Sequence, residues 1–169
     1  MEILNIAIPA LIVFLTAYLL LDKMLKNEEK RRMFELRKAN LPTITPIRLR
    51  AYERLTLFLE RISPNTLVVN STTTGMTSIE LHAKLLETIR QEYSHNISQQ
   101  VYVSENVWLS VNAAKESMIQ LINTCAMRCG AEQPATVLAE LIISVYASTE
   151  DTPIEIALKN LKEEVGRYF

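Results

Sequence analysis

Glycine, histidine, cysteine and tryptophan are scarce in this sequence. Its 169 residues include three Gly, two His, two Cys and one Trp. Because Gly75, Gly130 and Gly166 stand far apart, the chain has no phosphate-cradling glycine loop and no nucleophile elbow. It also lacks the H-E-x-x-H and C-x-x-C spacings of zinc and thiol sites. We therefore expect no catalytic residue, no metal site and no cofactor, which favours a protein that is not an enzyme.

The two cysteines are too few for a disulfide-rich scaffold. Cys125 and Cys129 are four positions apart on one expected helix, and the chain has no other cysteine. We interpret both as small apolar core residues. A metal pair or a redox switch is the alternative, and either would need further Cys or His nearby.

An excess of charge of one sign is also lacking, since the net charge is only −1. The average conceals two segments of opposite sign. Residues 22–54 contain ten Lys or Arg against five Asp or Glu, whereas residues 55–169 contain eight against thirteen. An acidic domain has no broad basic face, so we expect no nucleic-acid partner.

One long hydrophobic run is present near the N-terminus. Residues 3–21, ILNIAIPALIVFLTAYLLL, contain no charged side chain. As a helix they would extend about 28 Å, close to the roughly 30 Å hydrocarbon core of a bilayer. We interpret the run as an uncleaved transmembrane anchor. A signal peptide is disfavoured, because no basic residue precedes the run and no A-x-A pattern follows it; a buried core helix is the other alternative.

Basic residues lie on only one side of this run. Lys and Arg near a membrane helix are preferentially retained in the cytoplasm. The sequence therefore predicts a single-pass protein with its N-terminus outside and its C-terminal domain in the cytoplasm. We also expect the basic side chains after the run to contact anionic lipid headgroups: Lys23, Lys26, Lys30, Arg31 and Arg32.

The remaining chain divides into a stalk and a domain. Residues 22–46 are predicted to form a charged helical stalk that ends in a hinge, because Pro42 and Pro46 should break the helix after Asn40. Residues 47–169 are long enough to bury a core of their own. The expected fold is all-α: a transmembrane helix, the stalk, and an antiparallel bundle of about five helices.

Helix start signals and apolar periodicity place the five helices. The signals are Thr45-Pro46, the capping box from Thr77 to Glu80, Ser104, Gln133-Pro134 and Thr152-Pro153. The second helix should bury a stripe through Ile79, Ala83, Leu86, Ile89 and Tyr93. Two longer connections are expected: a surface loop over residues 65–75, and a polar loop over 94–103 that ends in a short extended Val-Tyr-Val piece.

The polar loop and the helix end before it form the densest group of hydrogen-bonding side chains. Such side chains cap a helix end or contact a partner. We predict a partner-binding surface here, with internal capping as the alternative. Trp108, close by in sequence, suits a core better than an interface. The predicted contact residues are Tyr93, His95, Asn96, Gln99, Gln100 and Tyr102.

Glu92 and His95 have the E-x-x-H spacing that places a carboxylate and an imidazole on one face of a helix. Di-iron bundles use this spacing, but they need a second E-x-x-H and two further glutamates. His82 has Ile79 three positions before it, so it supplies no second motif. A metal-binding enzyme or sensor domain built on Glu92 and His95 is therefore the alternative function.

The runs RAYERLTLFLERI (50–62) and QEYSHNISQQVYVS (91–104), followed by the helix of Trp108, resemble a family of small uncharacterised single-pass membrane proteins of Bacteroidetes bacteria. The resemblance extends from the predicted anchor to the last helix. It implies a bacterial inner-membrane setting, and it brings no activity, cofactor or catalytic residue. We expect a membrane-anchored, non-enzymatic adaptor or accessory subunit of a membrane-associated assembly. Its partners would be the lipid bilayer and either another protein or further copies of the chain.

Overall fold

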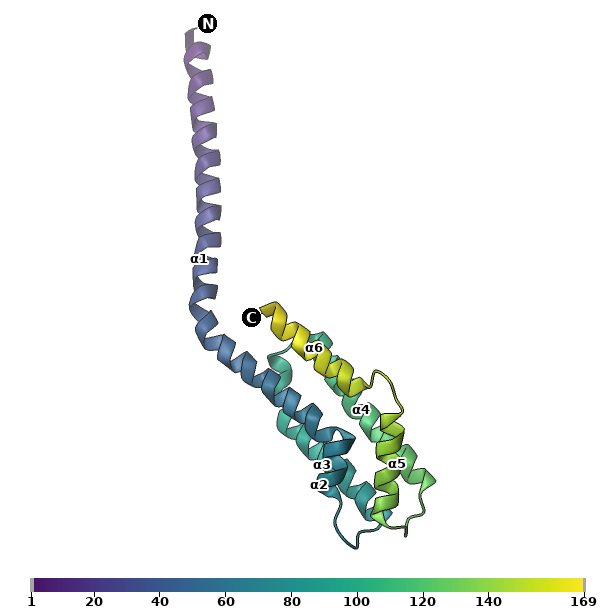
Figure 1. The fold of residues 1–169 in the computed structure, drawn as a ribbon. Coiled ribbons are helices and arrows are strands. Elements are labelled where there is room, and N and C mark those ends of the chain that lie inside the picture. Colours follow the sequence, from purple (N-terminus) through teal and green to yellow (C-terminus); the bar gives the residue numbers. More distant parts are fainter. Residues whose placement is uncertain (1, 169) are drawn as a thin grey trace. The chain divides into compact units, whose positions relative to one another are not determined.

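The computed structural model describes the backbone of residues 2–168 and the side chains of residues 14–35 and 42–168. Over this range the regular secondary structure consists of helices joined by short connections, and no strand occurs. It divides into two compact units, residues 1–46 and 47–169. The helices are α1 (Glu2–Ile62), α2 (Pro64–Ser71), α3 (Ser78–Asn96), the 3-10 helix η1 (Ile97–Val101), α4 (Glu105–Arg128), α5 (Ala135–Ala147) and α6 (Pro153–Tyr168) (Figure 1).

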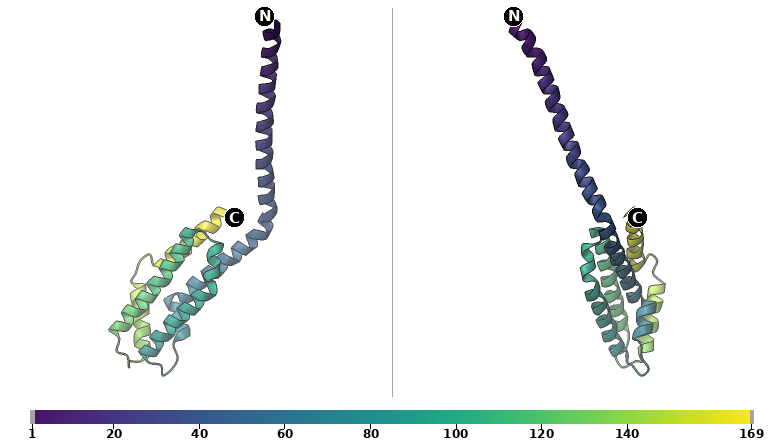
Figure 2. Two further views of the ribbon diagram at one scale, coloured as in Figure 1. Left: turned by 180° about the vertical axis from the view of Figure 1, so that it is seen from behind. Right: turned by 90° about the vertical axis from the view of Figure 1, so that its left-hand side faces the viewer.

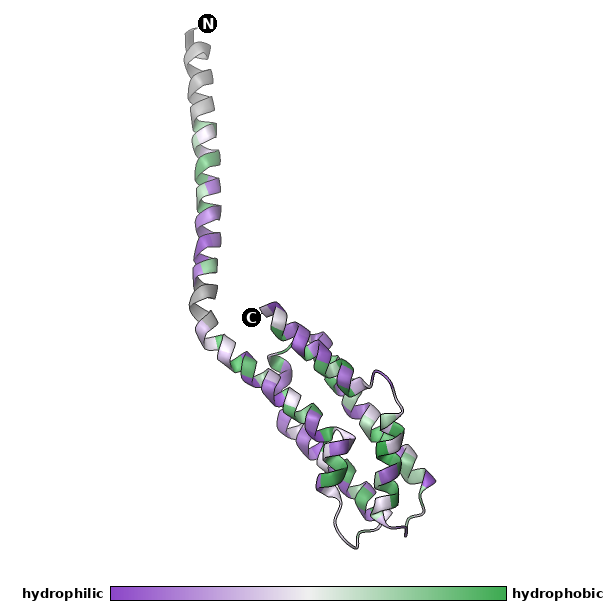
Figure 3. Ribbon diagram, viewed as in Figure 1, coloured by the Kyte–Doolittle hydropathy of each residue, from purple (hydrophilic) through white to green (hydrophobic). Residues whose placement is uncertain are grey.

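The first unit consists of the N-terminal part of α1. Six of its described charged side chains form three ion pairs at (i, i+4) spacing, which support an exposed helix by tenths of a kcal/mol each. Hydrophilic residues gather in the lower half of the stretch between the two grey segments in Figure 3. Among the described residues, none of the helices combines the length and the apolar character that crossing a membrane requires. Positions 3–13 of the predicted anchor lie outside the described side chains.

The predicted helix break between Leu41 and Pro46 is wrong, because α1 continues without interruption to Ile62. A proline in a helix interior removes one hydrogen-bond donor and costs about 3 kcal/mol. Pro42 and Pro46 are four positions apart, so the two missing hydrogen-bond donors lie on the same side of the helix. The amides around the two prolines can still donate within the helix, which explains how it continues through them.

The second unit is a helical bundle with one hydrophobic core (Figures 1 and 2). Helix α4 packs against α3, α5 and α6, and α2 packs against α3 and α5. The α1 segment within this unit buries one apolar face, which consists of Ala51, Leu55, Phe58, Leu59 and Ile62.

The expected helix starts at Thr77, Ser104 and Thr152 are confirmed. The Thr77 side chain accepts a hydrogen bond from the Glu80 amide, and the Glu80 carboxylate accepts one from the Thr77 amide. Ser104 caps α4 by accepting from the Val107 amide. Thr152 and Glu155 exchange the same two bonds at the start of α6. These caps satisfy amides that have no partner inside their helices.

The predicted stripe of α3 is right only in part: Ile89 is buried and Leu86 and Tyr93 pack against the core, but the rest of the stripe is exposed. Ile79 is 55% exposed, and the buried row runs through Leu81, Leu85 and Ile89 instead. Helix α3 has apolar residues on two rows that share Ile89, and periodicity alone does not say which row faces the core. Packing against α2, α4 and α5 selects the row of Leu81 and Leu85.

Both predicted long loops are largely helical. Residues 65–71 belong to α2, whose Leu67 and Val68 are buried. This helix starts with Ser63-Pro64, which terminates α1 and begins α2. In the second loop, α3 continues to Asn96 and η1 follows to Val101, so the expected extended Val-Tyr-Val piece is absent from the described backbone.

The two ends of the bundle are built from different segments. At one end Thr77 pairs with Pro134 in an isolated bridge, and the Ser78 amide donates to the Gln133 carbonyl at 2.8 Å. The other end, toward the C-terminus in Figures 1 and 2, brings together the α1 turns after Ile47, η1, the start of α4 and the end of α6. The predicted partner-binding residues lie near this second end.

Candidate functional site

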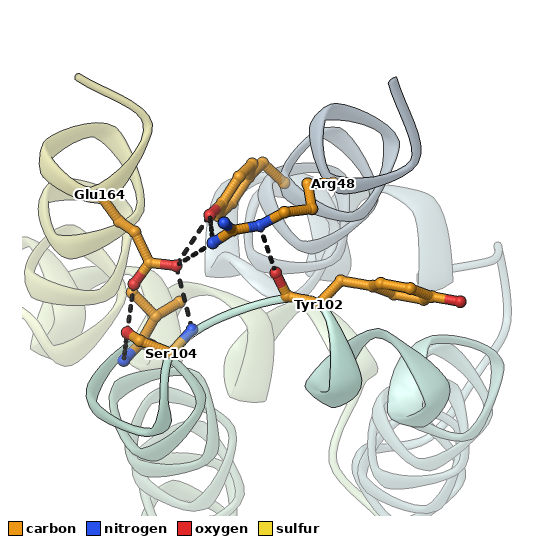
Figure 4. A network of polar contacts seen from close by, with 6 residues as sticks. Arg48, Tyr102, Ser104 and Glu164 are labelled. Atoms are coloured by element: carbon orange, nitrogen blue, oxygen red, sulfur yellow. Dashed lines mark hydrogen bonds and ion pairs between the residues drawn. The ribbon is translucent and has the colours of Figure 1, made fainter. Parts of the chain in front are cut away.

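The second end of the bundle contains a buried carboxylate. Glu164 of α6 is only 7% exposed. Its Oε1 accepts hydrogen bonds from the Tyr52 hydroxyl at 2.8 Å and the Ser104 amide at 3.0 Å. Its Oε2 accepts from the Ser104 hydroxyl. The carboxylate therefore joins α6 to α1 and to the first residue before α4 (Figure 4).

Arg48 completes this network from the side of α1. Its Nη2 lies 3.5 Å from Glu164 Oε1 and donates to the Tyr52 hydroxyl at 2.8 Å. Its Nε donates to the Tyr102 carbonyl at 3.0 Å (Figure 4). The guanidinium also lies over the Tyr168 ring, 4.0 Å from its centroid. One side chain thus contacts the segment after η1 and two residues of α6.

These contacts fix the charge states of the buried groups. Burial by itself would raise the pKa of Glu164. Hydrogen bonds from Ser104 and Tyr52 and the charge of Arg48 outweigh burial and hold the pKa of this carboxyl below its usual 4.5. Burial, followed by the hydrogen bond to Glu164, raises the pKa of Tyr52 to about 12. At neutral pH the site holds a carboxylate, a neutral phenol and a guanidinium.

Sequence reasoning missed Glu164, although a signal was present. Ile154, Ala157, Leu161 and Glu164 follow one another at steps of three, four and three, and all four are buried. A carboxylate on an apolar stripe indicates a buried charge that needs donors from neighbouring segments. Those donors, however, lie 60 and 112 positions away in the chain, at Ser104 and Tyr52. Local periodicity does not identify them.

The six predicted partner-binding residues divide into three groups by burial. Asn96 and Gln99 are buried. The side-chain amide of Asn96 donates to the Glu92 carbonyl at 2.8 Å, as a cap on the end of α3. Tyr93 is half-buried. His95 and Gln100 are exposed, and so is Tyr102 at 39%. Only the last three are accessible to a partner as side chains.

Tyr93 lies at the centre of an aromatic cluster. Its ring stacks on that of Trp108 at 5.9 Å and lies 6.0 Å from that of Phe58. Its hydroxyl donates to Asn112 at 2.8 Å, and the Lys115 ammonium lies 4.1 Å from its ring centroid. These contacts explain why Trp108 packs against the core rather than standing free, as expected.

Glu92 and His95 do line one cavity, of about 340 Å³, between α1 and α3. The two carboxylate oxygens of Glu92 both accept from Arg61 Nη1, at 3.1 Å each. Arg61 thereby places a positive charge beside the carboxylate, where a metal ion would have to bind. No group of three or more His, Cys, Asp or Glu suited to a metal ion occurs among the described residues.

A second cavity, of about 430 Å³, lies between the start of α3 and the end of α4. It is mainly apolar, and His82 in its wall makes a 2.8 Å hydrogen bond to Asn123. Cys129 lines it too, whereas Cys125 is buried in the core, where burial raises the pKa of its thiol.

Three of the five predicted membrane-surface residues are engaged in ion pairs along α1. Lys26 pairs with Asp22 at 2.7 Å, Arg31 with Glu35 at 3.0 Å and Arg32 with Glu28 at 2.9 Å. Lys23 and Lys30 make no ion pair within the described part of the chain. Being seven positions apart, they lie on the same side of the helix.

The variant Glu164→Gln should lower the free energy of unfolding at pH 7 by about 1–3 kcal/mol, because it removes the charge from a buried set of hydrogen bonds. A group whose pKa is depressed by folding stabilises the protein above its ordinary pKa and loses that effect as pH falls. The difference between wild type and variant should therefore shrink below pH 4.5. Denaturant unfolding of the full chain in mild detergent measures it.

The matched control is Glu163→Gln, a neighbouring exposed glutamate whose only described ion pair is to Arg167 at 3.9 Å. Its substitution should change the free energy of unfolding by about 0.5 kcal/mol at most. Equal destabilisation by the two variants would mean that the Glu164 network does not hold the bundle end.

Comparison with known proteins identifies a family for this chain. Residues 1–168 match a family model described as a family of unknown function, DUF7935. No curated protein and no solved structure matches the chain. Because the match extends over both units, the chain belongs to the family of unknown function DUF7935.

Proposed function

We propose that this protein is a membrane-anchored, non-enzymatic helical adaptor, an accessory subunit of an assembly at the bacterial inner membrane. The observation that carries the proposal is the uncharged run 3–21 with basic residues on one side only. Such a run with such a flank is typical of a single-pass anchor with a cytoplasmic C-terminal domain. The anchor would hold the bundle of residues 47–169 on the cytoplasmic side.

The surface of the bundle supports an interaction role. Apolar side chains of η1 are exposed beside the polar residues His95, Gln100 and Tyr102: Ile97 is 44% exposed and Val101 is 77% exposed. Solvent-exposed apolar and aromatic groups next to adaptable polar ones are characteristic of protein interfaces. This surface would contact a protein partner or a second copy of the chain.

Lys23 and Lys30 would contact the lipid bilayer directly. Neither is neutralised by an ion pair in the described part of α1. A basic side chain near an anionic membrane surface contributes about 1 kcal/mol to binding. Lys26, Arg31 and Arg32 would contribute less, since each already has an acidic neighbour.

Reporter fusions test the anchor. A reporter fused after Phe169 that works only in the cytoplasm should be active, and one that works only in the periplasm should be inactive. Replacing Lys23, Lys26, Lys30, Arg31 and Arg32 with Gln should reduce this preference, because it removes the topology signal. The opposite activity pattern in the unmodified chain would overturn the proposed orientation.

Affinity purification from membranes solubilised in mild detergent tests the adaptor role. The tagged full chain should recover a second protein in a fixed ratio, and a negative charge introduced on the exposed η1 surface, Val101→Glu, should reduce that recovery. Ala113→Glu, on the exposed side of α4, is the control. Recovery of the chain alone, as a monomer, would contradict the proposal.

A further inference from the structure

The cavity of about 340 Å³ between α1 and α3 is lined by an unusual concentration of basic side chains. Arg54 and Arg61 come from α1, and His95 comes from the end of α3; all three are exposed. Glu92 is the one carboxylate in its lining. This local excess of positive charge contrasts with residues 55–169 as a whole, where Asp and Glu outnumber Lys and Arg by five. We call this cavity the basic groove.

The two arginines of the groove retain free donors. Within the described residues Arg54 forms neither an ion pair nor a hydrogen bond. Arg61 uses only Nη1 for its two bonds to Glu92, so its Nη2 and Nε have no described partner. The pairing with Glu92 holds the Arg61 guanidinium in place at the rim. A guanidinium with free donors is suited to binding a carboxylate in a bidentate manner.

The spacing along α1 defines what the groove can accept. Arg54 and Arg61 are seven positions apart, on the same side of the helix, at an axial distance of about 10 Å. Leu57 lies between them in the groove and is 53% exposed. Arg50, also exposed, continues the row by one turn. The cationic side chains of Arg54 and Arg61 therefore flank the exposed apolar side chain of Leu57.

We infer that the basic groove binds an acidic helical segment of a partner protein, with carboxylates about two turns apart and an apolar side chain over Leu57. Carboxylates at positions i and i+7 of a helix have the spacing of Arg54 and Arg61. A single small anion would contact only one of the two guanidinium groups. The inference rests on the proposed adaptor function and names the chemistry of its partner.

The probe is a fluorescein-labelled helical peptide with Glu at positions i and i+7 and Leu at i+3 and i+4. The matched peptide carries Gln in place of both Glu residues. Fluorescence anisotropy with the full chain in a non-ionic detergent should show tighter binding of the Glu peptide by about tenfold or more. Raising the salt concentration from about 0.05 M to 0.5 M should weaken binding of the Glu peptide and reduce that difference.

Substitutions locate the binding. The double variant Arg54→Gln, Arg61→Gln should raise the Kd of the Glu peptide by about tenfold or more. Arg54→Gln alone should weaken binding without changing the melting temperature, because Arg54 has no described partner to lose. Arg90→Gln is the control, since Arg90 is an exposed arginine of α3 that does not line the groove. It should leave the Kd unchanged.

Three results would overturn the inference. The first is equal affinity for the two peptides, and the second is a loss of affinity in Arg90→Gln equal to that in the double arginine variant. The third is displacement of the Glu peptide by millimolar phosphate or by anionic vesicles as readily as by unlabelled peptide. The adaptor proposal and the groove inference can fail independently of each other. If a partner is captured from membranes equally well by wild type and by the double arginine variant, the basic groove is wrong and the adaptor proposal stands.

Discussion

The structure of the bundle end depends on burying the negative charge of Glu164. A carboxylate removed from water is tolerated only when donors surround it. Here the donors come from two segments far apart in the chain: Arg48 and Tyr52, one turn apart on α1, and Ser104 before α4. Each donor must be in place for the charge to be stable. The network therefore specifies how α1, α4 and α6 meet, beyond the general attraction of their apolar faces.

The same network positions the surface on which a partner is proposed to bind. Arg48 holds the backbone at Tyr102, because its Nε donates to the Tyr102 carbonyl. Glu164 holds Ser104 through two hydrogen bonds, one from the Ser104 amide and one from its hydroxyl. The segment between η1 and α4 is thus fixed at both of these residues. Asn96, the residue before η1, is held by the bond from its side chain to the Glu92 carbonyl at the end of α3. Fixed backbone lowers the entropy cost of presenting exposed side chains such as Val101 to a partner.

Sequence reasoning succeeded where a helix start is specified locally and failed where distant segments decide. The capping box at Thr77 and the caps at Ser104 and Thr152 were predictable, because each depends on residues three apart. The row of Leu81 and Leu85, by contrast, is selected by neighbouring helices. Composition misled at residues 65–71, where Ser, Thr and Asn suggested a loop but Leu67 and Val68 anchor α2 in the core. The basic groove needs α1 and α3 side by side, so no single stretch of sequence indicates it.

The most direct measurement is amide hydrogen exchange of the full chain and its Glu164→Ala variant, under conditions where both stay folded. If the buried carboxylate holds the bundle end, the amide of Ser104 should exchange markedly faster in the variant, together with those of the neighbouring residues 102 and 103. The Ser78 amide, bonded to the Gln133 carbonyl at the opposite end, should be unchanged. Unchanged exchange at Ser104, or equal acceleration at Ser104 and Ser78, would contradict this account.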